Sequence, residues 1–315
     1  MRMMERKTGT AGLEQLSETE LSERLGRYQR QARTWLRVGL FGIAGGLIAA
    51  AVVRNAALKA ILAAVLFGGG LCCALFLSGS AQKKLKTLMQ EQLGGFFRAE
   101  AEKSLGPALH TPGMRIDRAL LEVLPLLDGP WEECETEHFR EGSYRGVHFS
   151  AANVRLNHVY EQGHGQGSLG TGRDMVFKGL VIRCETCAPA PCAICAAARG
   201  ENSPRGVMTG DETFDRRFCV TAEREQDVRA LLTPQFMSWF DAFEQKLEGT
   251  LSCFIWEERV FTLALETDYG FAAVASSVDM SDLDAVRRSY CNSLREMEKT
   301  LDLLLENAAL FARRE

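Results

Sequence analysis

Four cysteines within twelve residues are the feature of this sequence that could most directly do chemistry. Cys184, Cys187, Cys192 and Cys195 follow the spacing C-x2-C-x4-C-x2-C. Paired C-x2-C knuckles commonly supply the thiolates of a tetrahedral structural zinc site, with Zn–S bonds of about 2.3 Å. The pattern therefore predicts a Zn²⁺ ion held by these four residues. Unliganded or redox-active thiols and an iron–sulfur site stay open, because the central spacer is shorter than in familiar zinc ribbons.

The rest of the sequence offers no comparable catalytic pattern. A closed four-thiolate site leaves no coordination position for a substrate. Gly165, Gly167 and Gly170 match G-x-G-x-x-G, but a strand-like run, MVFKGLVIR, follows where a dinucleotide fingerprint needs a helix. No serine or cysteine stands in a nucleophile-elbow context. We therefore expect a protein that is not an enzyme, and we identify no small-molecule substrate.

Two apolar runs, Val38–Val53 and Ala60–Ser78, indicate that the protein is anchored in a membrane. Each is close to the roughly 20 residues that a helix needs to cross a bilayer, and neither contains a charge. The short basic connector Arg54–Lys59 makes the two helices antiparallel neighbours. We predict a transmembrane hairpin over residues 36–80, with the lipid bilayer as its partner. Two buried helices of a soluble core are the alternative.

Charge predicts the orientation of this hairpin. Basic side chains are concentrated before the first run and after the second, whereas the connector contributes only Arg54 and Lys59. The positive-inside rule then predicts a multi-pass protein of the cell membrane with both termini in the cytoplasm. A reduced cytoplasmic domain agrees with ten cysteines in so long a chain. Residues 104–315 are acidic overall, so we expect no nucleic acid partner.

Hydropathy patterns divide the chain into four parts. We predict a cytoplasmic N-terminal helix over 1–35, the hairpin over 36–80, a juxtamembrane helical segment over 81–130 that Gly94–Gly95 interrupts, and an α+β domain over 131–315. In this domain, alternating β-formers predict strands at 144–149, 154–160, 175–183, 217–222, 251–256 and 260–265. Thr233 followed by Pro234 predicts the start of a helix, with Thr as the N-terminal cap and Pro at the first helical position. The fold class is therefore α+β, with a mostly antiparallel sheet and flanking helices.

A heptad pattern near the C-terminus suggests a second kind of function. Ser281 and Asp284 predict the start of the last helix, and apolar residues then recur at spacings of four and three from Tyr290 to Phe311. This face either packs on the sheet or forms a seam for a protein partner or for self-association. The leading hypothesis is a membrane-anchored cytoplasmic interaction or scaffolding module. A metal- or redox-responsive sensor that uses the four cysteines is the alternative, and an enzyme is the least favoured.

Several motifs in the second half of the chain resemble one known family. The run FKGLVIRCE at 177–185, the stretch 212–240 and the hairpin FIWEERVFTLAL at 254–265 carry the resemblance. The matching positions are Phe177 and Gly179, then Asp211, Phe214, Phe218 and Val220, then Asp227, Ala230, Leu231, Leu232, Thr233 and Pro234. They resemble the bacterial membrane family catalogued as domain of unknown function 3137, over about residues 80–270. The resemblance implies two N-terminal helices in the bacterial inner membrane, and it implies no catalytic residues.

Overall fold

The computed structural model describes residues 16–53, 55–109, 116–124, 130–164, 168–199, 206–222, 224–268 and 270–311. The chain forms two compact units. The first, here called the hairpin unit, comprises Met1–Arg98 and Ser276–Arg288. The second, the sheet unit, comprises Ala99–Ala275 and Ser289–Glu315.

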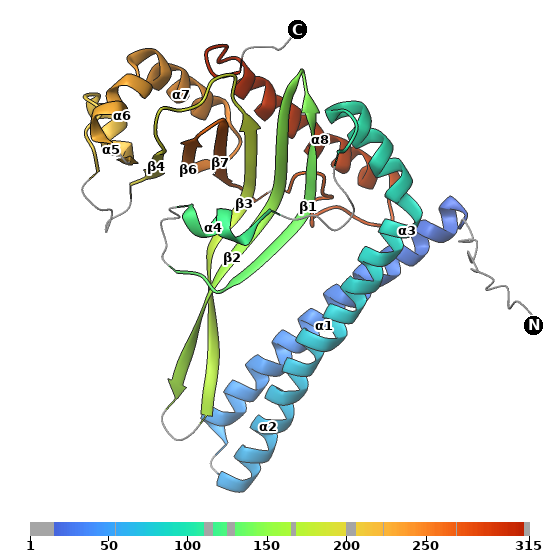
Figure 1. Cartoon of the computed structure of the whole chain (residues 1–315). Coiled ribbons are helices and arrows are strands. Elements are labelled where there is room, and N and C mark those ends of the chain that lie inside the picture. Colours follow the sequence, from blue (N-terminus) through green and yellow to red (C-terminus); the bar gives the residue numbers. More distant parts are fainter. Residues whose placement is uncertain are drawn as a thin grey trace, which may run out of the picture. The chain divides into compact units, whose positions relative to one another are not determined.

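Two long antiparallel helices form the hairpin unit (Figure 1). Helix α1 (Glu18–Val52) begins at Ser17, whose side chain accepts a hydrogen bond from the backbone N–H of Glu20. Helix α2 (Ala56–Cys72) begins at Asn55 and continues through the π-helical turn η1 (Cys73–Leu77) into α3 (Ser78–Leu105). Helix α1 and the continuous helix from α2 to α3 are each long and apolar enough to cross a membrane.

Glycines bring the backbones of α1 and α2 into direct contact. A Cβ atom added at Gly42 would lie 2.8 Å from the Cα of Gly70, and one added at Gly70 would lie 2.7 Å from the carbonyl oxygen of Gly39. Small residues at such crossings let membrane helices approach closely. The large apolar side chains point outward instead. Among the described residues, all but four of the exposed large hydrophobic side chains lie between Trp35 and Leu77.

Helix α3 differs from the prediction, because it runs through Gly94–Gly95 without an interruption. Each glycine costs about 1 kcal/mol in a helix relative to alanine. Buried neighbours offset that cost, since Leu93 is 3% exposed and Ala101 is 5% exposed. Tertiary packing therefore overrides the local preference at this position.

The sheet unit contains one antiparallel sheet of seven strands in the order β1-β2-β3-β7-β6-β4-β5, which confirms the α+β fold class (Figure 1). The strands are β1 (Glu133–Tyr144), β2 (Val147–His164), β3 (Ser168–Glu185), β4 (Ile194–Ala198), β5 (Phe218–Ala222), β6 (Thr250–Glu257) and β7 (Val260–Glu266). The predicted strand at 144–149 is wrong, because a tight turn at Arg145 and Gly146 separates β1 from β2. Both turn residues have positive φ, at 49° and 83°, as a two-residue hairpin turn requires.

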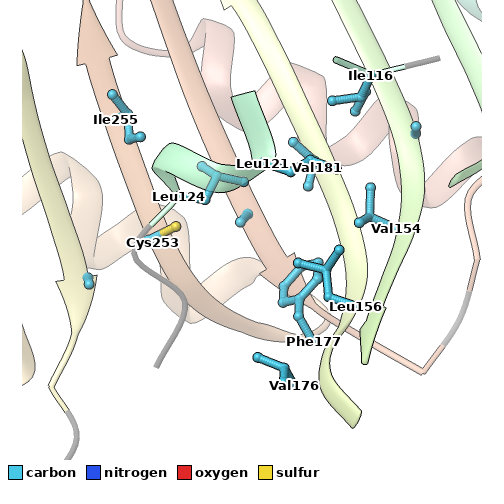
Figure 2. Close-up of a cluster of buried hydrophobic side chains, with 13 residues drawn as sticks. Ile116, Leu121, Leu124, Val154, Leu156, Val176, Phe177, Val181, Cys253 and Ile255 are labelled. Carbon is cyan, nitrogen blue, oxygen red and sulfur yellow. The ribbon is translucent and has the colours of Figure 1, made fainter. Parts of the chain in front are cut away.

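The two faces of the sheet are covered by different helices. The short helix α4 (Arg118–Val123) places Leu121 on one face, in a cluster with Val181 and Ile255 that Figure 2 shows. The opposite face carries Phe254 and Phe261, and α7 (Pro234–Lys246) packs on it through Phe240, whose ring centroid lies 4.8 Å from that of Phe254. Alternation along each strand separates these two sets of side chains.

The remaining helices differ in part from those that the sequence predicts. Helices α5 (Glu212–Arg217) and α6 (Glu225–Leu231) are too short for a period-based prediction. Helix α8 (Leu283–Leu305) begins one residue after Asp282, which accepts the backbone N–H of Ala285 at 2.8 Å. The predicted start at Ser281 and Asp284 is therefore wrong by one residue, because Asp282 is the N-terminal cap.

Candidate functional site

The first and last cysteines of the predicted zinc site lie on opposite faces of the sheet. Cys184 of β3 pairs with Phe261 of β7, Phe261 pairs with Trp256 of β6, and Trp256 pairs with Ile194 of β4. Paired residues of neighbouring strands point to the same face. Cys195 follows Ile194 directly, so its side chain points to the other face, where it packs with the α4 cluster.

The other two cysteines belong to the loop between β3 and β4, here called the cysteine loop (residues 186–193). Cys187 is partly exposed and its thiol donates to the carbonyl oxygen of Ala309 at 3.2 Å, whereas Cys192 is buried. Among the described residues, no group of three or more His, Cys, Asp or Glu side chains could hold a metal ion. The geometry therefore gives the predicted zinc site no support.

Burial also opposes metal binding at two of these thiols. It raises the pKa of Cys184 to about 12, and it raises the pKa of Cys195 to about 12 as well. Thiolates rather than thiols bind metals, so both side chains are poor ligands at neutral pH as they stand. These two cysteines behave as small apolar residues of the core.

A cavity of about 470 Å³ opens beside the cysteine loop. It lies between the first turns of α7, the end of β6 and the turn of residues 306–310 that follows α8. We call it the indole cavity, because Trp239 and Trp256 line it together with Leu231, Phe236, Ala308 and Leu310. Its volume falls within the range of about 300–1,000 Å³ that is typical of ligand sites.

The sequence holds the aromatic wall of this cavity in place through a helix cap. Thr233 accepts the backbone N–H of Phe236 at 3.2 Å, and Pro234 occupies the first helical position. Phe236 then stacks on Trp256 of β6, with an interplanar angle of 11° and centroids 6.4 Å apart. Trp239 follows on the same helical face, 5.4 Å from Phe236. These contacts hold the aromatic wall in one arrangement.

Polar groups at the cavity determine what it could accept. The indole N–H groups of Trp239 and Trp256 are buried and have no hydrogen-bond partner among the described residues. Buried donors of this kind normally find an acceptor. At the rim, the carboxylate of Glu306 pairs with Lys246 at 3.5 Å. The protein covers both N–H groups, so the accessible lining of the cavity is mainly apolar and aromatic.

The cysteine loop supports one wall of the indole cavity. The backbone N–H of Cys187 donates to the carbonyl oxygen of Leu310 at 2.8 Å, next to the thiol contact with Ala309. Arg259, in the turn between β6 and β7, donates to the carbonyl oxygen of Cys187 at 3.0 Å. The loop therefore acts as a brace for residues 309 and 310.

Sequence reasoning identified Thr233 and Pro234 correctly as a helix start, but it missed the cavity that they border. The heptad face was the predicted contact surface, and in the fold it is buried. Tyr290 is 5% exposed and Leu294 and Leu301 are each 1% exposed, within the sheet unit. Ala308 belongs to the same pattern but is exposed, because α8 ends at Leu305. It lines the indole cavity rather than the core. Gly165 and Gly167 lie outside the described residues.

The residues that carry the family resemblance have structural roles. A Cβ atom added at Gly179 would overlap the carbonyl oxygen of Leu265, so only glycine permits the close approach of β3 and β7. Asp211 caps α5 by accepting the backbone N–H groups of Thr213 and Phe214. The rings of Phe214 and Phe218 contact each other at a tilt of 37°, with centroids 4.9 Å apart. The motifs therefore specify packing rather than chemistry.

Comparisons with known proteins assign a family to one segment of the chain. No curated protein matches the chain. Among solved structures, the mycobacterial trehalose monomycolate transport factor A, TtfA, is similar over 55% of this chain and 75% of its own, with 11% identity and a TM-score of 0.27. That likeness is too weak to carry an argument. Residues 175–304, from within β3 to the last turn of α8, match the family described as "Protein of unknown function (DUF3137)". The predicted family is therefore confirmed for this segment, whereas residues 80–174 of the predicted span lie outside the match.

Proposed function

We propose that this protein is a membrane-anchored binding module without enzymatic activity. Its hairpin would span the cell membrane twice, and its sheet unit would bind a protein partner in the cytoplasm. The observation that supports the anchor is the row of exposed apolar side chains between Trp35 and Leu77. Soluble proteins rarely expose apolar patches of this extent, whereas hydrocarbon is a favourable solvent for them.

The distribution of charge supports the orientation that we propose for the hairpin in the membrane. Five arginines lie between residues 24 and 37, just before the first apolar run, and Lys83, Lys84 and Lys86 follow the second. The turn between the helices carries only Arg54 and Lys59. Basic residues prefer the cytoplasmic side of a membrane. Both termini, and with them the sheet unit, would therefore be cytoplasmic.

The indole cavity is the feature that supports partner binding. A partner that inserts an apolar side chain would replace water against Phe236 and Trp256. Tryptophan-rich, preorganised pockets are typical positions for the residues that dominate binding energy. The sensor hypothesis has less support, because Cys184 and Cys195 point to opposite faces of the sheet.

Site-specific photo-crosslinking in intact membranes tests this proposal. A photoreactive residue at Gln235, an exposed position that lines the cavity, should form an adduct with one defined protein. The substitution Ala308→Trp, which fills the cavity from an exposed position, should abolish that adduct. Ala242→Trp is the matched control, because Ala242 is exposed on α7 but does not line the cavity. An adduct that survives Ala308→Trp would contradict the proposal.

A further inference from the structure

A second cavity, of about 360 Å³, lies in the hairpin unit between α1 and α3. We call it the basic cavity, because Arg24, Lys83 and Lys84 line it together with the hydroxyl-bearing residues Tyr28, Ser80 and Thr87. Leu88 and Glu91 complete the lining, and Glu91 contributes its only carboxylate. The lining therefore combines an excess of positive charge with several hydroxyl donors.

Helical spacing explains how these residues meet. Arg24 and Tyr28 are four residues apart on α1, so they lie on the same face one turn from each other. On α3, Ser80, Lys84 and Thr87 follow at spacings of four and three and form a second stripe. The two stripes face one another across the cavity. Each helix thus contributes both cations and hydroxyls to a single site.

The positive charges of this cavity are largely unneutralised by the protein. In the described part of the chain, neither Lys83 nor Lys84 has a carboxylate within salt-bridge distance. Arg24 pairs with Glu20 at 3.6 Å, and both side chains are about half exposed. Such a surface pair contributes little, so it competes weakly with an incoming anion. Like charges held together without counterions are a site at which an anion binds favourably.

Depth in the bilayer suggests which anion this is. Ser80 and Lys84 follow Leu77, the last apolar residue of the second run, by three and seven residues. At 1.5 Å per residue, they lie about 5 and 10 Å beyond the hydrocarbon. The headgroup layer is roughly 5–8 Å thick on each side, and lysine side chains reach back toward it. The end of the cavity formed by Ser80, Lys83 and Lys84 therefore lies nearest the depth of lipid phosphates, and the rest of the lining extends further from the hydrocarbon.

We propose that the basic cavity binds the phosphate of an anionic phospholipid from the cytoplasmic leaflet. Lys83 and Lys84, at the end of the cavity nearest the bilayer, would neutralise the phosphate oxygens, and the hydroxyl of Ser80 would donate a hydrogen bond to them. Basic pockets between membrane helices on this side are suited to acidic headgroups. This inference rests on the proposed membrane insertion, but it is independent of the indole cavity.

The test compares two charge-matched variants of the full-length protein in phosphatidylcholine nanodiscs titrated with phosphatidylglycerol. Retained lipid is measured by native mass spectrometry after gentle release. The double variant Lys83→Gln/Lys84→Gln should bind phosphatidylglycerol roughly 30-fold more weakly, at about 1 kcal/mol per lysine. The control Arg27→Gln/Lys86→Gln removes the same charge from positions that do not line the cavity, and it should bind as the wild type does.

Three further readouts keep the outcomes distinct. Flotation of the wild type with vesicles first establishes insertion, so a protein that does not float contradicts the proposed anchoring rather than the lipid site alone. Equal weakening in both double variants would overturn the proposal in favour of general surface attraction. Inorganic phosphate that competes as well as the lipid does would overturn a lipid ligand. Matching circular dichroism spectra would show that both variants fold.

Discussion

Gly179 gives the sharpest test of how this fold is held together. A Cβ atom at this position would overlap the carbonyl oxygen of Leu265. It would also lie 2.8 Å from the carbonyl carbon of Leu265 and 3.0 Å from the Cα of Glu266. All three are backbone atoms of β7, so no side-chain rotation can relieve the clash. The substitution Gly179→Ala must therefore push the central strands β3 and β7 apart at the end of their pairing where Gly179 is aligned with Glu266.

The cost of that displacement can be worked out from the pairing of these strands. Gly179 is aligned with Glu266 on one side and with Val154 of β2 on the other. Overpacking a well-packed site costs about 1–3 kcal/mol, and each weakened backbone hydrogen bond adds about 1 kcal/mol. For one weakened backbone hydrogen bond, we therefore expect Gly179→Ala to lower the free energy of unfolding by about 2–4 kcal/mol. This is a large part of the 5–15 kcal/mol that stabilises a typical domain.

Urea unfolding of the full-length protein in detergent, followed by tryptophan fluorescence, measures this loss, because Trp239 and Trp256 report on the sheet unit. The matched control is Gly94→Ala on α3, where nothing lies within 4 Å of the added Cβ. That substitution should leave the sheet transition unchanged and strengthen the helix by about 1 kcal/mol. If Gly179→Ala unfolds at the same urea concentration as the wild type, the close approach of β3 and β7 does not require glycine at this position.

Three other experiments test the contact between α1 and α2, the burial of the cysteines and the hydrogen bond of Tyr144. Gly42→Leu should disrupt the contact of α1 with α2 and lower the temperature at which helical circular dichroism is lost, whereas Gly68→Leu should not, because the space around Gly68 is open. Alkylation at pH 8 followed by peptide mapping should label Cys187 long before Cys184 or Cys195, because burial raises the pKa of each of those two thiols to about 12. Elemental analysis that finds one zinc per chain would contradict the separation of these thiols. Burial, together with the hydrogen bond from the Tyr144 hydroxyl to Asp302, raises the pKa of Tyr144 to about 12, so its contribution to stability is complete below pH 10 and is lost as the pH rises toward 12. Alkaline titration of the unfolding free energy should therefore show a smaller decline in Tyr144→Phe than in the wild type.

Local signals in the sequence were sufficient for much of the fold. Thr233 and Pro234 predicted the start of α7, and the alternation at 251–265 predicted β6 and β7. Failures occurred where distant packing decides. Gly94–Gly95 did not end α3, and β4 carries too few residues, ICAAA, to be recognised by alternation. The indole cavity was also out of reach, because Ala308 and Trp256 are brought together only by the tertiary fold.

The cysteine pattern shows why spacing alone could not decide the chemistry. In a loop, C-x2-C-x4-C-x2-C could fold around one ion, but in this protein the outer cysteines lie in strands. A side chain in a strand points to a face set by its parity, and a shift of one residue reverses it. The pairing of β3, β7, β6 and β4 gives Cys184 and Ile194 the same face, which leaves Cys195 on the other. A register shift of one residue in β4 would bring Cys195 to the face of Cys184, but it would move Ile194, which is fully buried, toward the α4 cluster and break its packing. The apolar core, rather than the thiols, therefore fixes the register and with it the separation of the cysteines.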